Sequence, residues 1–252
     1  MKYLVLGPSG MGIYGIIGNL KSIEERLDLF QEISGSSAGS IIALMLGVGL
    51  NIDEITKRLL DIDTACLSTS VSLRNILNTY GGVCPRVAKQ LIEELTGCDP
   101  TFSELKRKIY VSSYNLKRSQ TEYFSSDTHP NMKVIDAVYK SCSIPFVFGC
   151  LDMYVDGGLC EKLPIAPFLQ HRNEEVYIIE TTEISEPDDI NDFISYASCI
   201  TKNLIMNRVD YLQYTQRIRI PISMTQVVDF KMSQEDKLKL YIKGFKENII
   251  SL

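Results

Sequence analysis

The run Gly35-Ser36-Ser37-Ala38-Gly39 has the G-x-S-x-G spacing of a nucleophile elbow. It follows an apolar-tending segment, residues 27–33, and precedes a segment with helical periodicity, so we expect a strand, a sharp turn and a helix. Such a turn strains the central serine, and glycines two positions away on either side relieve the crowding. The helix would direct its N-terminal amides at an anion. The pattern predicts Ser37 as a nucleophile, although small residues also cap helices and fill close packings.

A second glycine-rich turn, residues 7–12, follows a predicted buried strand over residues 2–6. The carboxyl ends of neighbouring parallel strands share one edge of a sheet, so this turn can supply backbone amides near Ser37. Pro8 has no N–H to donate. We therefore predict an oxyanion hole in the rest of the turn, built from Ser9, Gly10, Met11 and Gly12.

The same turn has a competing interpretation as a dinucleotide-binding loop. Residues 10–15 match G-x-G-x-x-G, and Glu32 lies twenty positions after Gly12, where a ribose-binding acid would sit. A dinucleotide site needs no serine at the end of the next strand, so the elbow favours the oxyanion interpretation. A third possibility is that the glycines only permit close packing of strand and helix.

The chain offers few groups that could act as a base for Ser37. Its two histidines, His129 and His171, lie in polar segments that we expect to be exposed loops. Asp156 ends an apolar strand, so its carboxylate could reach the same edge of the sheet as Ser37. Burial would raise its pKa and make it a better base. Two alternatives stay open: Asp-Gly is also a hairpin turn, and His171 follows Asp156 in the α/β-hydrolase order.

Composition restricts the remaining possibilities. The net charge of −5 argues against a broad nucleic-acid-binding face. The seven cysteines are odd in number and contain no C-x-x-C, so we expect a reducing, intracellular compartment without a disulfide framework. Residues 3–20 are uncharged but rich in glycine, so we read neither a signal peptide nor a membrane span and expect a soluble cytoplasmic protein. A chain of 252 residues fits a single domain, residues 1–252.

Predicted strands alternate with predicted helices, which indicates an α/β fold with a mostly parallel sheet covered on both faces. Beyond the two strands already given, we expect strands at 109–114, 121–125, 153–155, 176–180 and 217–222, the first two as an antiparallel pair. We expect helices at 13–27, from the elbow to near 49, and at 51–60, 85–97, 131–142, 187–213 and 233–250. Residues 61–82 give no clear pattern.

Taken together, these motifs resemble those of the patatin-like phospholipases, over nearly the whole chain and in the family's order. The four matching stretches are the glycine-rich loop that begins at Gly7, the elbow between Gly35 and Gly39, a Ser-x-x-Ile-Pro-like stretch at 141–148, and Tyr154-Val155-Asp156-Gly157-Gly158-Leu159.

The resemblance implies a three-layer α/β/α sandwich and a serine acyl hydrolase of the phospholipase A or lysophospholipase type. It places Ser37 as nucleophile and Asp156 as its base, without a catalytic histidine, metal or cofactor. The substrate would be a phospholipid or another lipid ester, and transient contact with a membrane surface would follow. Apolar residues at 67–77 and 146–148 could line an acyl channel or touch a membrane, although core packing would also explain them.

Two residues depart from the family's pattern. Ser9 stands where the family has a third glycine in the oxyanion loop, and Met11 stands where it has an arginine or lysine. Because backbone amides would hold the oxyanion, loss of that side-chain cation should not abolish activity. The same two departures nevertheless suggest an alternative, a non-catalytic protein that binds a lipid or a partner on the same fold. A dinucleotide-binding oxidoreductase, suggested by the glycine pattern, is a more distant alternative.

Overall fold

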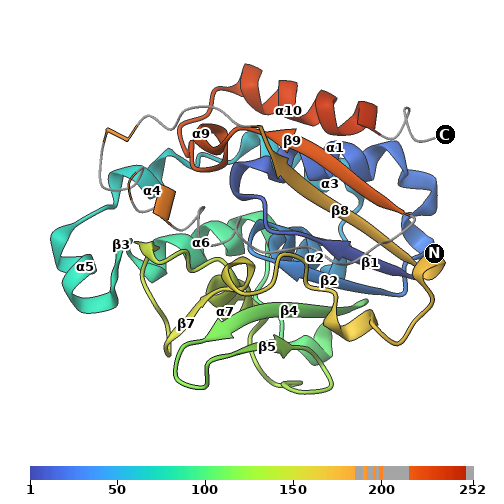
Figure 1. The fold of residues 1–252 in the computed structure, drawn as a ribbon, viewed down its shortest axis with the longest axis horizontal. Coiled ribbons are helices and arrows are strands. Elements are labelled where there is room, and N and C mark those ends of the chain that lie inside the picture. The colour runs from blue at the N-terminus through green and yellow to red at the C-terminus, as the bar shows by residue number, and fades with distance from the viewer. Residues whose placement is uncertain (185–189, 192–195, 197–198, 201–215, 248–252) are drawn as a thin grey trace.

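The computed structural model describes the whole chain except residues 185–189, 192–195, 197–198, 201–215 and 248–252 (Figure 1). Most of the helix predicted at 187–213 falls outside the described residues. No helix in the described part of the chain is both long and apolar enough to cross a membrane.

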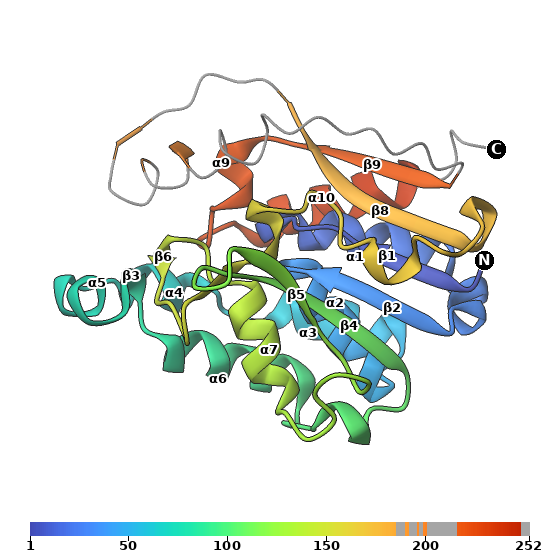
Figure 2. The same ribbon diagram turned by 60° about the horizontal axis from the view of Figure 1, so that its bottom comes forward.

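A mostly parallel sheet forms the centre of the molecule (Figures 1 and 2). Its main strand order is β5-β4-β2-β1-β8-β9, and β7 pairs antiparallel with β4. The strands are β1 (Tyr3–Leu6), β2 (Glu32–Ser36), β4 (Lys108–Asn115), β5 (Gln120–Phe124), β7 (Tyr154–Asp156), β8 (Val176–Glu183) and β9 (Arg217–Ile222). A separate parallel pair joins β3 (Gly81–Val83) to β6 (Phe146–Phe148). The predicted α/β sheet and the predicted β4–β5 antiparallel pair are confirmed.

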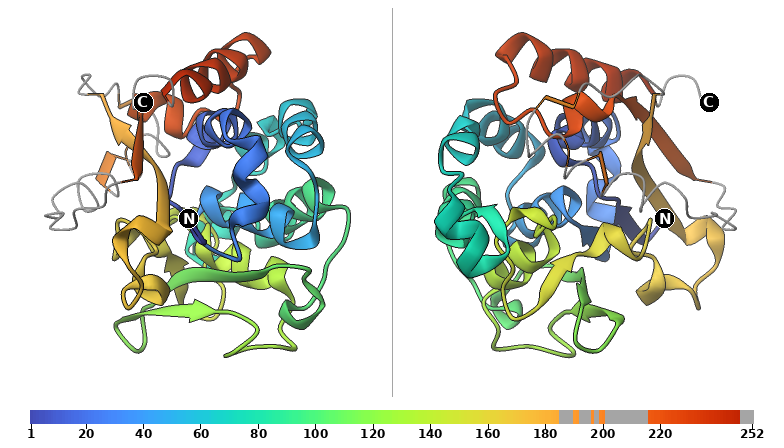
Figure 3. Two further views of the ribbon diagram at one scale, coloured as in Figure 1. Left: turned by 90° about the vertical axis from the view of Figure 1, so that its right-hand side faces the viewer. Right: turned by 60° about the vertical axis from the view of Figure 1, so that its left-hand side comes forward.

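Helices flank this sheet, and the described long helices pack on one face (Figure 3). The helices are α1 (Ile13–Ser22), α2 (Ala38–Val48), α3 (Ile52–Asp61), α4 (Ala65–Thr69), α5 (Leu73–Thr79), α6 (Pro85–Thr96), α7 (Val134–Ser141), α9 (Met224–Val227) and α10 (Gln234–Glu247). The other face buries a smaller cluster, including Val5, Phe168 and Ile178, under segments that contain short 3-10 turns. The larger core therefore lies between the sheet and the long helices.

Local sequence sets the ends of several helices, and α2 ends and α3 begins close to the predicted positions. Asn51 caps α3, because its side chain accepts from the Glu54 N–H while the Glu54 carboxylate accepts from the Asn51 N–H. Gly49 ends α2 in the left-handed conformation, with φ of 93°. The helix predicted at 13–27 is shorter, because α1 ends at Ser22 and a 3-10 segment covers Glu24–Leu29.

The predicted second strand at 27–33 is wrong in its boundaries. The strand is β2, and it ends with the small residues Ser34, Gly35 and Ser36 of the elbow itself. These residues are small because α2 crosses the end of the strand very closely. A Cβ on Gly35 would lie 2.7 Å from the Gly39 carbonyl oxygen, and one on Gly39 would lie 2.4 Å from the Leu6 carbonyl oxygen. The apolar pattern missed this strand because steric space, rather than hydrophobicity, selects its residues.

The pairing along β4 brings the end of β2 and the end of β7 together. β5 occupies one edge of β4, and the other edge pairs first with β2 and then with β7. Ser36 of β2 is opposite Ser112, and Asp156 of β7 is opposite the next residue, Ser113. Ser37 and Asp156 are therefore brought to neighbouring positions by backbone register.

We predict that Gly39→Ala severely destabilises the protein. The added methyl group would meet backbone atoms of Leu6 and Gly7, which cannot move without disturbing β1. We expect a loss of about 3 kcal/mol or more in the free energy of unfolding, measured with denaturant.

Gly47→Ala on the same helix is the matched control. There the nearest atom to the added Cβ is the Ile109 side-chain Cγ2, at 3.1 Å, which can move slightly. A Gly39→Ala protein as stable as Gly47→Ala would contradict the close approach of α2 to β1.

Candidate active site

Ser37 occupies the turn between β2 and α2 in a strained conformation, with φ of 51° and ψ of −129°. Such a positive φ is uncommon for any residue except glycine. The turn is held by hydrogen bonds on both sides of the peptide. The Ser37 N–H donates to the Ser141 hydroxyl oxygen at 2.8 Å, and the Ser37 carbonyl accepts from the Ser40 N–H and the Ser40 hydroxyl. The side chain is directed into a pocket that Ser37 lines.

Asp156 is almost completely buried, with 3% of its surface exposed. Its Oδ1 accepts from the Gly158 N–H at 2.8 Å, while Oδ2 has no hydrogen-bond partner of ordinary geometry among the described residues. Burial raises the pKa of this carboxyl to about 6, and the Ser37 hydroxyl and the Gly158 N–H oppose part of that rise. The carboxylate is therefore desolvated and close to the Ser37 hydroxyl, with one oxygen available to accept a proton.

The end of α7 holds both residues at once. Ser141 accepts the Ser37 N–H through its hydroxyl, and two positions later the Ser143 carbonyl accepts the Asp156 N–H at 2.9 Å. The Ser113 hydroxyl fixes this end of the helix to β7, because it interacts with the carbonyls of Lys140 and Val155. One short segment therefore sets the spacing between the serine and the aspartate. The sequence motif included Ser141 and Ser143, but nothing in it indicated these contacts.

The glycine-rich turn lies against the same pocket. Gly10 and Met11 line the pocket with Ser37 and Ala38. Gly10 needs to be glycine, because its φ is 51° and an added Cβ would lie 2.3 Å from the Val227 carbonyl oxygen. The Gly12 N–H already donates to the Ser9 carbonyl at 2.8 Å, so this amide of the predicted oxyanion hole is occupied. The N–H groups of Ser9 and Gly10 have no protein acceptor within the described part of the chain.

Gly157 and Gly158 allow Asp156 to approach the turn and the sheet. A Cβ on Gly157 would lie 2.6 Å from the Ser112 carbonyl oxygen, and one on Gly158 would lie 2.8 Å from the Pro8 ring. The residues after Asp156 form a 3-10 turn that Asp156 caps, rather than a hairpin. The hairpin alternative for Asp-Gly is therefore wrong.

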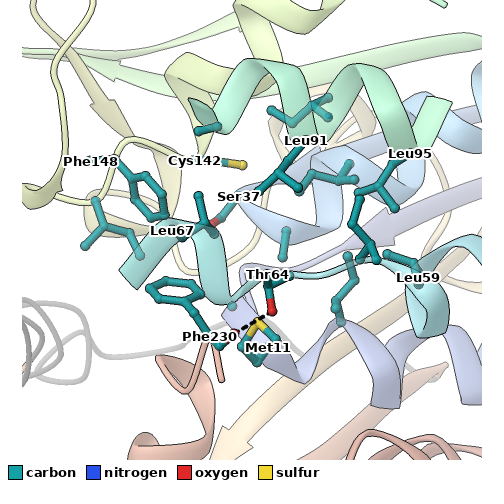
Figure 4. Close-up of a pocket in the computed structure, with 18 of the residues that line it drawn as sticks. Met11, Ser37, Leu59, Thr64, Leu67, Leu91, Leu95, Cys142, Phe148 and Phe230 are labelled. Carbon is teal, nitrogen blue, oxygen red and sulfur yellow. Dashed lines mark hydrogen bonds between the residues drawn. The ribbon is translucent and has the colours of Figure 1, made fainter. Parts of the chain in front are cut away.

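The pocket itself is a cavity of ≈ 120 Å³ with an apolar lining. Figure 4 shows Ser37 between one end formed by Leu67 and Phe148 and another formed by Leu59 and Leu95. Leu67 and Phe148 belong to the two apolar segments predicted to line an acyl channel. Other members of those segments, Leu73, Leu77 and Phe146, are exposed and do not line the cavity.

Cys142 lines the pocket beside Ser37, and the sequence did not single it out. Its Sγ lies 4.0 Å from the Ser40 hydroxyl oxygen. Burial raises the pKa of the thiol far above its usual range, with the nearby Asp156 charge acting in the same direction. Cys142 is therefore a neutral thiol, which packs against the elbow and is poorly suited to act as a nucleophile.

The residues that the sequence offered for other roles, two histidines as possible bases and Glu32 as a ribose-binding acid, lie away from the pocket. His171 stacks on Tyr3 at a centroid distance of 4.0 Å, and His129 packs against Phe124. Neither histidine lines the pocket. Glu32 begins β2, opposite Tyr3, so it lies at the end of the strand far from the glycine-rich turn, and it accepts from the Tyr110 hydroxyl. A ribose-binding acid would be needed at the other end of β2, so the dinucleotide interpretation has no support.

The chain matches known sequences over most of its length. A sequence model of the family described as "Patatin-like phospholipase" matches residues 4–169. "Uncharacterized protein R571" of Acanthamoeba polyphaga mimivirus is 31% identical, over 98% of this chain and 94% of that protein. "Probable lipid hydrolase 463L" of Invertebrate iridescent virus 6 is 25% identical, over 69% of this chain and 65% of that protein. The "cGAMP-activated phospholipase" of Escherichia coli (strain TW11681) is 26% identical, over 63% of this chain and 51% of that protein.

Solved structures share the fold. VipD from Legionella pneumophila superposes with a TM-score of 0.65 and 15% identity, covering 99% of this chain and 66% of that one. Full-length ExoU from Pseudomonas aeruginosa, in complex with SpcU, gives a TM-score of 0.58 and 16% identity, covering 100% of this chain and 53% of that one. The chain therefore spans about half to two thirds of the length of these structures and of two of the three sequence relatives.

We predict that Ser141→Ala destabilises the fold by leaving the buried Ser37 N–H without an acceptor. The expected loss in the free energy of unfolding is about 1–3 kcal/mol. Ser143→Ala is the control: among the described residues the Ser143 hydroxyl interacts with Tyr139 and not with Ser37, and the Ser143 carbonyl remains to accept from the Asp156 N–H. Ser141→Thr keeps a hydroxyl and should recover part of the loss. Equal stability of the two alanine variants in denaturant would contradict the role of Ser141.

We predict that Asp156→Asn stabilises the protein at neutral pH. The folded-state pKa of about 6 lies above the 3.8 that is usual for an aspartate, so ionisation costs stability above about pH 6, and that cost disappears below about pH 4. A neutral amide avoids it, giving a gain of up to about 3 kcal/mol near pH 7 and little change near pH 4.

Denaturant unfolding at both pH values tests the Asp156→Asn prediction. The fully exposed Asp28 supplies the control substitution, Asp28→Asn. An Asp156→Asn protein less stable than the wild type near pH 7 would contradict the burial penalty.

Proposed function

The chain belongs to the patatin-like phospholipase family, and on that premise we propose that it is a serine lipid acyl hydrolase acting through Ser37 and Asp156. Membership supports lipid hydrolysis in general. The phospholipase A or lysophospholipase type, the dyad and the acyl-enzyme are our proposal. The observation that carries it is the desolvated Asp156 carboxylate beside the strained Ser37, at the wall of an apolar cavity.

In the first step, Ser37 Oγ forms a bond to the ester carbonyl carbon while Asp156 accepts the hydroxyl proton. A carboxylate with a pKa near 6 is a stronger base than an ordinary aspartate and is still mostly ionised at neutral pH. The carbonyl oxygen becomes negative, and the free N–H groups of Ser9 and Gly10, with that of Met11 and the start of α2, would stabilise it. Each such donor contributes roughly 3 kcal/mol to lowering the barrier.

The tetrahedral intermediate then collapses. The bond from carbon to the leaving oxygen breaks, and Asp156 returns its proton to that oxygen, so an alcohol or a lysophospholipid departs. The acyl group remains on Ser37 Oγ. Water next attacks the acyl carbon and gives a proton to Asp156, which passes it to Ser37 Oγ as the fatty acid leaves. Over the two steps every proton released is taken up again, and the Ser37 and Asp156 side chains with one water molecule carry out all the proton transfers.

The cavity supports an acyl chain as the part of the substrate that is recognised. Aliphatic side chains such as Leu59, Leu91 and Leu95 form much of its wall. An acyl chain bound there would leave the polar end of the lipid outside the apolar lining. The side chains of Ser9 and Met11 do not remove the backbone amides that would hold the oxyanion, so these departures from the family's pattern are compatible with activity.

We expect a fluorophosphonate probe to label the wild-type protein covalently, because Ser37 Oγ displaces fluoride from phosphorus. Ser37→Ala should lose all labelling, and Asp156→Asn should slow it by about 100-fold or more through loss of the base. Hydrolysis of a panel of phospholipids and lysophospholipids by the same three proteins identifies the ester that is cleaved.

A buried serine whose side chain the proposal does not use serves as the control. Ser143→Ala should be labelled at close to the wild-type rate, since within the described part of the chain the Ser143 hydroxyl interacts with Tyr139 and not with Ser37 or Asp156. A folded wild-type protein that is not labelled, and that hydrolyses none of the esters, would favour the alternative of a non-catalytic lipid- or partner-binding protein.

A further inference from the structure

The helix α5 exposes both of its leucines to solvent, unlike an ordinary surface helix, which buries such residues. Leu73 and Leu77, one turn apart, are 78% and 80% exposed, and no residue of α5 is buried. The aromatic residues Tyr80 and Phe146 are exposed nearby, and Gly81, which follows Tyr80, pairs with Phe146. We call Leu73, Leu77, Tyr80 and Phe146 the apolar platform. Figures 1 and 2 show α5 at one end of the molecule, projecting beyond its body.

Polar groups attach this helix to the protein. Asn75 Nδ2 donates to the carbonyls of Ser70 and Gly82, and the Ser72 hydroxyl caps the helix. The Thr79 carbonyl accepts from the Cys150 N–H at 2.6 Å. Hydrogen bonds thus anchor the inner side of α5, and the leucines are left on the outer side. In water this arrangement loses the free energy that burying two leucines would provide, which marks the outer side as a site of contact with an apolar phase.

The backbone at the two aromatic positions is also strained. Tyr80 has φ of 63° and Phe146 has φ of 67°, in the left-handed region that glycine adopts most easily. A glycine or asparagine would adopt this conformation with less strain, so the bulky side chains are kept there at a cost in conformational energy.

The platform is continuous with the candidate active site. Phe146 and Phe148 are two positions apart in β6, and the first is exposed while the second lines the pocket. Leu67 of α4, which precedes α5 in the chain, forms the same end of the pocket (Figure 4). β6 therefore contributes to both the platform and the pocket wall, and α4, which contributes Leu67 to the wall, immediately precedes α5 in the chain.

The charged side chains around the platform indicate whether its partner is anionic or neutral. Residues 64–92 contain Arg74, Arg86 and Lys89 and no acidic residue, in a chain whose net charge is −5. Lys89 pairs with Asp136, whereas Arg74 and Arg86 are exposed and have no ion-pair partner within the described residues. Arg74 lies next to Leu73 in the platform helix. Apolar side chains beside free cations match the surface of a bilayer that contains anionic lipid.

We propose that the apolar platform docks on an anionic phospholipid bilayer and places the Leu67–Phe148 end of the pocket at the lipid surface. This inference rests on the proposed function, because the docked bilayer supplies the ester. The leucines enter the interfacial region while Arg74 and Arg86 contact lipid phosphates. The apolar platform would then bring the pocket to a phospholipid substrate that is almost insoluble in water as single molecules.

The test is co-sedimentation of the full chain with vesicles of phosphatidylcholine alone or with about 30% phosphatidylglycerol. Binding is measured in the Ser37→Ala background so that hydrolysis does not alter the vesicles. We expect Leu73→Ser/Leu77→Ser to weaken binding by roughly 10- to 100-fold. Arg74→Glu should weaken binding to the anionic vesicles by about tenfold and leave the weaker binding to neutral vesicles nearly unchanged.

The matched control is Leu238→Ser/Ile242→Ser on α10, an exposed apolar pair with the same helical spacing, 45% and 49% exposed. It should bind vesicles like the parent protein, and thermal unfolding verifies that all variants are folded. Equal binding by parent and Leu73→Ser/Leu77→Ser would overturn the proposal. The proposal would also be overturned if the protein bound no vesicles and formed a dimer that these substitutions dissociate, because a second copy would then cover the platform.

Labelling by the fluorophosphonate probe separates this proposal from the proposed function. Vesicle binding that depends on the platform, without labelling of the wild-type protein at Ser37, would leave docking supported and the hydrolase wrong. Labelling of the wild-type protein at Ser37 without any binding to vesicles would support the hydrolase and overturn the docking proposal.

Discussion

The proximity of Ser37 and Asp156 depends on a change of pairing strand along one edge of β4. This edge pairs with β2 as far as Ser112 and with β7 from Ser113 onward. Two strands that arrive from opposite directions therefore end against each other, and the residue after one and the last residue of the other become neighbours. A shift of one position in the β4–β7 pairing would turn the Asp156 side chain to the opposite face of the sheet, away from Ser37. Close packing of small residues protects this register, since Gly157 fits against Ser112 with no space for a Cβ.

Sequence patterns predicted the elements that hydrophobicity and capping control. The start of α3 after residue 51, the end of α2 near Gly49 and the β4–β5 pair follow from local chemistry that is visible in the chain. The second strand was misplaced, because β2 ends in serine and glycine and carries little hydrophobic signal. Residues 61–82 had no clear pattern for a related reason: α5 presents leucines outward and polar groups inward, which inverts the rule that the prediction applies.

The candidate site was predictable in its residues but not in its supports. Spacing and chain order in the sequence alone indicate Ser37, Asp156 and the glycine-rich turn as the candidate residues. The acceptor for the Ser37 N–H lies 104 positions away, and a contact of that separation leaves no trace in a single sequence. The occupied Gly12 amide likewise depends on how the turn closes on Ser9, which composition does not determine. Glu32 shows the converse: its spacing fitted a nucleotide site, but the direction of β2 places it at the wrong end of the sheet.

The contacts at the end of α7 have a consequence for how this chain can vary. The Ser37 N–H and the Asp156 N–H are bound by groups only two residues apart, at Ser141 and Ser143. The distance between the Ser37 turn and the Asp156 backbone is thus set by the end of one helix, and the long intervening segments do not set it. Insertions or deletions in the connections between α2 and α7, such as the α4–α5 region, can alter what the protein touches without changing that geometry. The surface around α4 and α5 can therefore vary in sequence and length while Ser37 and Asp156 keep their relative positions.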